Sequence, residues 1–105
     1  MRQERQKYQD QIEAQFRDLD QRIDDLAARI EKENSEARTK ARGREYRDKS
    51  QQEIAELQRK REIARRKLEN LRNSSQDAWQ DMKVGIDAAM RDLKSAYDQA
   101  ASHFQ

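Results

Sequence analysis

The chain of 105 residues contains no proline and no cysteine, and its only glycines are Gly43 and Gly85. Without cysteine it can form no disulfide, no thiolate metal site and no cysteine nucleophile. Without proline, no residue is forced to interrupt a helix. No run approaches the roughly 20 apolar residues that span a membrane, and the first residues lack the apolar core of a signal peptide. We therefore expect a soluble cytoplasmic protein.

Apolar residues at helical spacing run through most of the chain. They recur every three or four positions from Tyr8 to Ile30, from Ile54 to Leu71 and from Trp79 to Ala100. This period is typical of helices that pack along their length. Charged residues make up 42% of the chain and hydrophobic residues 33%, which is too little apolar material for a thick core. The sequence predicts an all-α fold: one coiled-coil domain over residues 1–105, arranged as a long hairpin or three-helix bundle.

The predicted helix-packing interface consists of the larger side chains of this apolar stripe. They are Ile12, Phe16, Leu19, Ile23, Leu26, Ile30, Ile54, Leu57, Leu68, Leu71, Trp79, Met82, Ile86, Leu93 and Tyr97. Trp79 is the first apolar residue after the break between the second and third helices. We therefore expect its side chain to be buried against the end of the second helix.

The clearest break between helices is the run Asn73-Ser74-Ser75. Ser74 or Ser75 could cap a new helix by accepting a hydrogen bond from a free amide, and Asp77, three residues after Ser74, completes a pattern that resembles a capping box. The sequence thus predicts one helix at about 45–72 and another at about 76–104.

The segment 34–44 decides the expected oligomeric state. Most of its residues are good helix formers, which favours continuity between the helix at about 2–33 and the one at about 45–72, although Gly43 also permits a turn. A straight helix of about 70 residues would be roughly 105 Å long, so the third helix could cover only part of it. The first stripe would then need a second chain, and we expect an antiparallel, swapped homodimer. A turn would give the same contacts within a monomer.

The net charge of +2 is unevenly distributed. Residues 1–37 hold 7 basic and 10 acidic side chains, residues 38–72 hold 13 and 6, and residues 73–105 hold 3 and 5. A basic middle segment beside two acidic segments would be electrostatically matched to both. The same basic segment could bind phosphates of a nucleic acid, but Glu45 and Asp48 interrupt it. Nucleic-acid binding is therefore the weaker alternative function.

The remaining features argue against an enzyme and leave a membrane surface as an alternative partner. His103 is the only histidine, and the sequence contains no glycine-rich phosphate loop. We predict no catalytic activity, no cofactor, no metal and no small-molecule substrate. The amphipathic segment 76–104 could lie on a lipid surface as apolipoprotein-type helices do, but it has fewer basic than acidic residues. Packing of its apolar face against the other helices is the favoured interpretation.

The third segment resembles a family of small, uncharacterised bacterial coiled-coil proteins that share a D-A-W-x-D-L-K-x-G pattern followed by A-A-x-x-F. The match comprises Asp77, Ala78, Trp79, Asp81, Lys83, Gly85, Ala100, Ala101 and Phe104, with Met82 in place of leucine. The segment before it is also similar to that family, so the resemblance covers roughly residues 45–105. It implies a helical fold and a bacterial origin but no particular activity. The leading hypothesis is a structural or interaction protein that self-associates through its helices and meets an unidentified protein partner.

Overall fold

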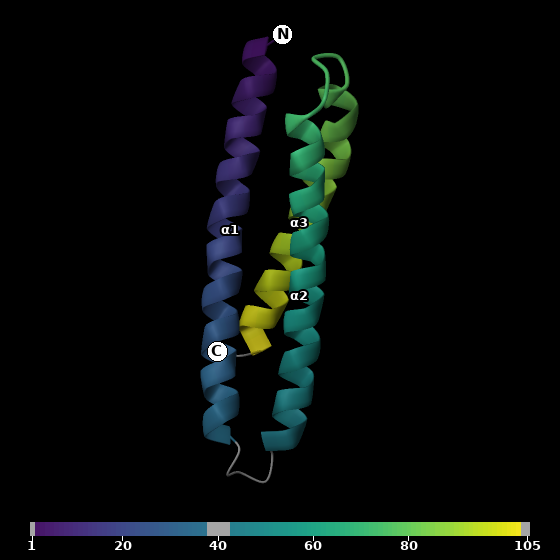
Figure 1. The fold of residues 1–105 in the computed structure, drawn as a ribbon. Helices are drawn as coiled ribbons and strands as arrows, with labels where there is room; N and C mark the ends of the chain where they lie inside the picture. Colours follow the sequence, from purple (N-terminus) through teal and green to yellow (C-terminus); the bar gives the residue numbers. More distant parts are fainter. Residues whose placement is uncertain (1, 38–42, 104–105) are drawn as a thin grey trace.

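The chain folds into an elongated bundle of three helices. The computed structural model describes residues 2–37 and 43–103, which contain the helices α1 (Arg2–Ala37), α2 (Gly43–Arg72) and α3 (Trp79–His103) and no strand. α2 runs antiparallel to α1, and α3 runs in the same direction as α1 (Figure 1). The bundle measures 59 × 19 × 17 Å. The prediction of an all-α three-helix bundle is confirmed.

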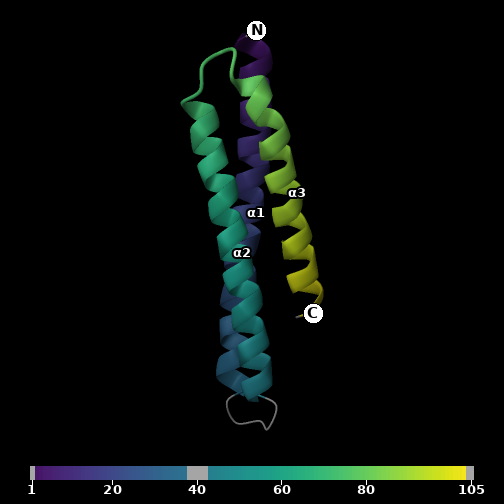
Figure 2. The same ribbon diagram turned by 90° about the vertical axis from the view of Figure 1, so that its right-hand side faces the viewer.

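The preference for a straight connection between the first two helices is wrong. Residues 38–42 lie outside the described residues, but α1 and α2 on either side of them lie next to each other (Figures 1 and 2). The longest dimension of 59 Å is far below the roughly 105 Å of a straight helix. Helix propensities differ by a few tenths of a kcal/mol per residue, whereas burying one large apolar side chain contributes about 1.5–3 kcal/mol. Packing of the two apolar stripes therefore decides the geometry.

The antiparallel packing of α2 on α1 removes the reason to expect a swapped dimer. In the closed bundle, the stripe of α1 is covered by α2 and α3 of its own chain, and Ile23 and Ile30 are almost completely buried. No second chain is required to cover that stripe. The homodimer itself stays a prediction.

The third helix begins three residues later than predicted, at Trp79. The Ser74 hydroxyl donates a hydrogen bond of 2.7 Å to the carbonyl of Leu71, so this serine terminates α2. The Ser75 hydroxyl oxygen accepts a bond of 3.3 Å from the amide of Ala78 and supports the turn that leads into α3. Of the two serines that could cap the third helix, Ser75 is the one that accepts a backbone amide hydrogen bond.

The hydrophobic core runs along the bundle axis and contains the whole predicted packing interface. Four of its side chains (Phe16, Ile54, Met82 and Tyr97) are partly buried and pack against the core. The others are buried: Ile12, Leu19, Ile23, Leu26, Ile30, Leu57, Leu68, Leu71, Trp79, Ile86 and Leu93. The small residues Ala64, Ala89 and Ala100 and the flexible Met90 complete it. α3 packs mainly on α2, and it ends part-way along the α1–α2 hairpin (Figure 2).

Gly85 lies inside α3 without being required there. A Cβ atom at this position would meet only the Lys67 ammonium group, at an ordinary contact distance of 3.6 Å. The backbone of α3 therefore does not depend on glycine to approach α2, contrary to the close helix approach that such a residue usually indicates.

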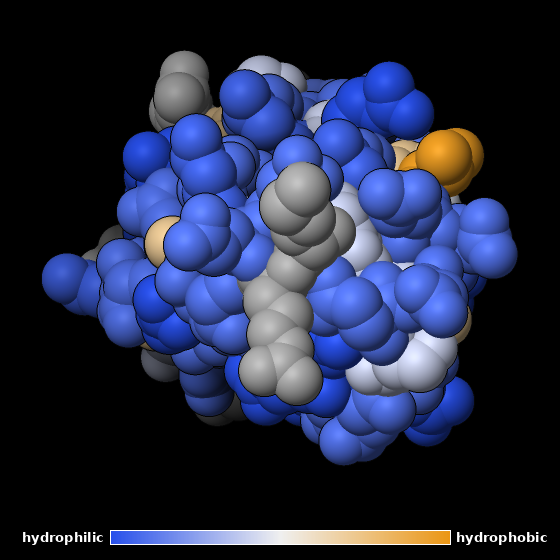
Figure 3. All heavy atoms as spheres, turned by 90° about the horizontal axis from the view of Figure 1, so that it is seen from above, coloured by the Kyte–Doolittle hydropathy of each residue, from blue (hydrophilic) through white to orange (hydrophobic). Residues whose placement is uncertain are grey.

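The exposed surface is mainly hydrophilic. The view along the bundle axis shows polar residues over almost all of this end, with hydrophobic residues only as isolated spots (Figure 3). Among the described residues, the large hydrophobic side chains that are exposed are Val84 (74%) and Ile63 (39%). None of the three helices is both long enough and apolar enough to cross a membrane, over the residues described.

Candidate functional site

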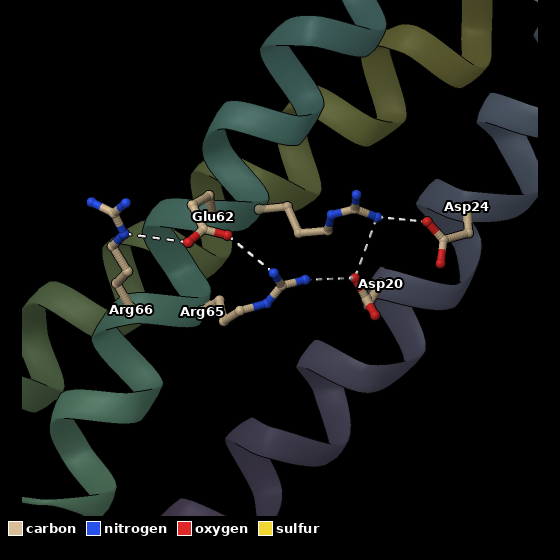
Figure 4. Close-up of polar contacts among 6 residues, drawn as sticks. Asp20, Asp24, Glu62, Arg65 and Arg66 are labelled. Atoms are coloured by element: carbon tan, nitrogen blue, oxygen red, sulfur yellow. Dashed lines mark hydrogen bonds and ion pairs between the residues drawn. The ribbon is translucent and has the colours of Figure 1, made fainter.

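Charged side chains close the seam between α1 and α2. Arg61 of α2, with only 18% of its side chain exposed, lies 2.6 Å from Asp24 and 3.4 Å from Asp20 on α1. Arg65 pairs with Glu62 on its own helix at 3.1 Å and reaches towards Asp20 at 3.9 Å (Figure 4). The basic middle segment is thus matched to its acidic neighbour, as the charge distribution suggests. Its arginines at this seam are already engaged by acids.

The beginning of α1 also holds the end of α2. The Arg5 guanidinium donates a hydrogen bond of 3.0 Å to the carbonyl of Leu71 in the last turn of α2. Arg72 in the same turn forms an ion pair with Glu13 of α1. A cation beside free carbonyls at a helix C-terminus is favoured by the helix dipole. Polar contacts between α1 and α2 therefore stabilise this end of the bundle.

Tyr8 joins α1 to α3 at the same end of the bundle. Its hydroxyl donates a hydrogen bond of 2.7 Å to Asp87, and its ring lies 5.8 Å from the ring of Trp79 at an interplanar angle of 34°. The ammonium group of Lys83 lies 5.2 Å from the centre of the Tyr8 ring. Burial, followed by the hydrogen bond and charge of Asp87, raises the pKa of the Tyr8 hydroxyl above its ordinary value. Tyr8 thus stays protonated and keeps this contact.

Beyond Tyr8, a groove of about 610 Å³ separates α1 from α3. Its apolar lining comes from core residues of both helices, and its edges carry charged and polar groups. The lining residues are Ile12, Gln15, Asp18, Leu19 and Arg22 from α1, and Asp87, Met90, Arg91, Lys94, Tyr97 and Asp98 from α3. Four of them (Ile12, Leu19, Met90 and Tyr97) belong to the core or pack against it. The groove is thus a place where the core comes close to the surface.

The charges at the groove are only partly neutralised within the chain. Asp18 pairs with Arg22 at 3.1 Å on the α1 edge, and Asp87 accepts the hydrogen bond from Tyr8. On the α3 edge, by contrast, neither Arg91 nor Lys94 forms an ion pair with any residue that the structure describes. The groove therefore offers two cations in addition to its apolar lining.

The only histidine of the sequence lies outside the groove lining. His103 contacts Glu53, so it connects the last turn of α3 to α2. Within residues 2–37 and 43–103, no three His, Cys, Asp or Glu side chains are grouped so that they could hold a metal ion. The groove combines an apolar lining with charged and polar groups at its edges, a combination that is common in binding sites.

The groove was not predicted from the sequence, although all its apolar lining residues except Met90 belong to the predicted interface. A usable signal was the pair Arg91 and Lys94, which stand at helical spacing in a segment that holds more acidic than basic residues. Neither family models nor curated proteins nor solved structures match the chain. The resemblance of residues 77–104 to small bacterial coiled-coil proteins therefore stays a prediction.

Proposed function

We propose that this protein is a non-enzymatic interaction module whose α1–α3 groove binds an amphipathic helix of another chain. The observation that carries this proposal is the groove itself: two parallel helices with core residues between them and charges along both edges. Docking of an apolar helix face into such a groove is a common mode of peptide recognition. A fourth helix in this position would convert the bundle from three helices to four.

The alternatives receive less support from the contacts of the chain. Lipid binding by α3 would use its apolar face, but Trp79, Ile86 and Leu93 on that face are buried in the bundle. The bundle would have to open before this face could meet a membrane surface. Nucleic-acid binding by α2 would need free arginines, yet Arg61 and Arg65 are paired with acids.

Position-specific cross-linking tests the proposal. A photo-reactive amino acid at Gln15, an exposed residue at the groove, is compared with the same amino acid at Gln58, an exposed residue of α2 outside it. After irradiation in the native host, we expect a conjugate from position 15 and little from position 58. Its mass distinguishes self-association, which doubles the mass of 12.6 kDa, from binding of a different protein. Equal yields from both positions, or none from position 15, would contradict the proposal.

A further inference from the structure

We infer that the helix bound in the α1–α3 groove belongs to a different protein and carries two acidic side chains, three or four residues apart, at the centre of its docked face. This inference rests on the proposed function and adds the chemistry of the partner. It follows from the order of the charges along the α3 edge of the groove, from the contacts that these charges make, and from the burial of the apolar helix faces in a second copy of this chain.

The charges on the α3 edge of the groove change sign twice along the helix. Asp87, Arg91, Lys94 and Asp98 all line the groove. Their spacing of three or four residues places them on one side of the helix. The edge is thus cationic at its centre and acidic at each end. A partner helix with acids at the centre would face opposite charge there, whereas one with bases at the centre would face like charge.

The two central cations, together with Asp98 at one end of the edge, are the groove charges that a partner can use. Asp87 already accepts a hydrogen bond from Tyr8, and Asp18 across the groove is paired with Arg22. Arg91 and Lys94 form no ion pair with the part of the chain that the structure describes. Both side chains are exposed beside an apolar lining, so a partner docked there would shield them from water and strengthen their attraction to opposite charges. Charge complementarity of this kind sets the register and the choice of partner.

The geometry defines the length and spacing of the partner. Arg91 and Lys94 are three residues apart, so they lie about 4.5 Å apart along the helix axis. Two acids at positions i and i+3, or i and i+4, of the partner helix have a matching separation. The lining on α3 extends from Asp87 to Asp98, which corresponds to about 18 Å of helix. A partner helix of three to four turns with leucine-like residues facing Leu19 and Met90 would fill the groove.

A second copy of the chain is a poorer occupant than a different protein. The apolar stripe of each helix is buried within its own bundle, including Ile23, Leu57 and Leu93. Over the described helices, a folded copy therefore presents no apolar face that could enter the groove, and it would have to open first. A partner whose amphipathic helix is free needs no such opening.

Two synthetic helical peptides of identical composition test the inference. Both have an apolar face of leucines. The acid-centred peptide carries two glutamates at the middle of the face edge and a lysine near each end, and in the base-centred peptide these positions are exchanged. Because composition and net charge are equal, any difference in affinity reports the order of the charges. By isothermal titration calorimetry we expect the acid-centred peptide to bind about ten-fold more tightly or better.

Charge reversal in the protein provides the decisive comparison. The double variant R91E/K94E should prefer the base-centred peptide. The matched control K32E/K49E removes two exposed lysines outside the groove with the same change in net charge, and it should keep the preference of the unmodified protein. Circular dichroism and urea denaturation of both variants verify that each is folded.

The possible outcomes distinguish failure of the inference from failure of the proposed function. Equal affinity for the two peptides, or an unchanged preference in R91E/K94E, overturns the inference, while a conjugate from position 15 would still support the interaction module. Lack of binding by either peptide together with lack of that conjugate overturns both. Flotation with anionic vesicles without any peptide preference overturns the inference in favour of a lipid surface, and a conjugate of twice the chain mass overturns it in favour of self-association.

Discussion

The two seams that α1 forms with its neighbours differ in how they are closed. Along the α1–α2 seam, arginines of α2 meet aspartates of α1 near the middle of the bundle, and Arg72 meets Glu13 nearer its end. Along the α1–α3 seam, the polar contact is made by Tyr8 with Asp87, at one end, and a groove follows. α1 therefore forms one closed seam, with α2, and one open seam, with α3.

The difference indicates that the net charge of each helix determines which pairs of helices form a closed seam. Residues 1–37 and 73–105 are both acidic overall, whereas residues 38–72 are basic. The basic helix can neutralise an acidic neighbour, but two acidic helices gain nothing by pairing their edges. Apolar burial brings all three helices together, and complementary charge then determines where the edges meet.

The largest effect is expected from Trp79→Ala, which removes the aromatic side chain at the closed end of the α1–α3 seam. Trp79 is 5% exposed and lies beside Tyr8. Its truncation should lower the free energy of unfolding by about 3–5 kcal/mol, measured by urea denaturation followed by circular dichroism. The control Val84→Ala, on the same helix but 74% exposed, should change it by less than about 0.5 kcal/mol. Similar losses in the two variants would contradict the closed end.

A smaller effect is expected from Arg61→Ala, which breaks the charged α1–α2 seam. The Arg61 side chain is 18% exposed and contacts Asp20 and Asp24, so a loss of about 1.5 kcal/mol is expected at low salt. The loss should shrink as ionic strength rises. Arg66→Ala is the matched control, because Arg66 is 75% exposed and pairs only within α2. A loss from Arg66→Ala as large as that from Arg61→Ala would show that this seam is not closed by charge.

Tyr8→Phe tests the polar contact of the open seam and should cost about 1 kcal/mol at neutral pH. The raised pKa of Tyr8 means that the folded state keeps this proton above the ordinary tyrosine value of 10.0. The unfolded chain loses it first, so the stability of the unmodified protein should fall as pH rises above 10. This fall should be smaller in Tyr8→Phe and unchanged in Tyr97→Phe. Parallel pH profiles for Tyr8→Phe and the unmodified protein would remove the Asp87 contact from this account.

No change is expected when a short glycine-rich segment is inserted between Ala37 and Gly43. In the closed bundle α1 and α2 already run antiparallel within one chain of 12.6 kDa, so static light scattering should show the same number of chains per particle before and after insertion. A swapped dimer would instead show twice this mass and become monomeric on insertion. A doubled mass for the unmodified protein at micromolar concentration would therefore restore the dimer.

The sequence was sufficient to predict the three helices but not the connections between them. Apolar periodicity located the three helices and their core, because burial repeats with the helical turn. It could not place the reversal between α1 and α2, since propensities in this segment differ by less than the packing energy gained by folding back. The start of α3 was predicted three residues too early, because the Ser75 hydroxyl and carbonyl both accept from the Ala78 amide and hold a turn before the helix begins.

The candidate site was less accessible from sequence than the fold. Ile12, Leu19 and Tyr97 were expected in the packing interface, but their pattern does not tell which part of a seam stays open. That depends on the relative positions of helices, which side-chain packing sets only within a range of angles. The Tyr8–Asp87 contact joins residues 79 positions apart, and no local pattern signals it.

The central position of α2 along the chain bears on how fast the bundle forms. α1 and α3 each pack on α2, their neighbour in sequence, whereas the open groove lies between the helices that are most distant along the chain. Proteins dominated by contacts between neighbouring segments fold rapidly, because little loop entropy is lost before the contacts form. Either hairpin, α1–α2 or α2–α3, can serve as the nucleus onto which the remaining helix docks. The open α1–α3 seam thus leaves the chain few of its slowest contacts to form.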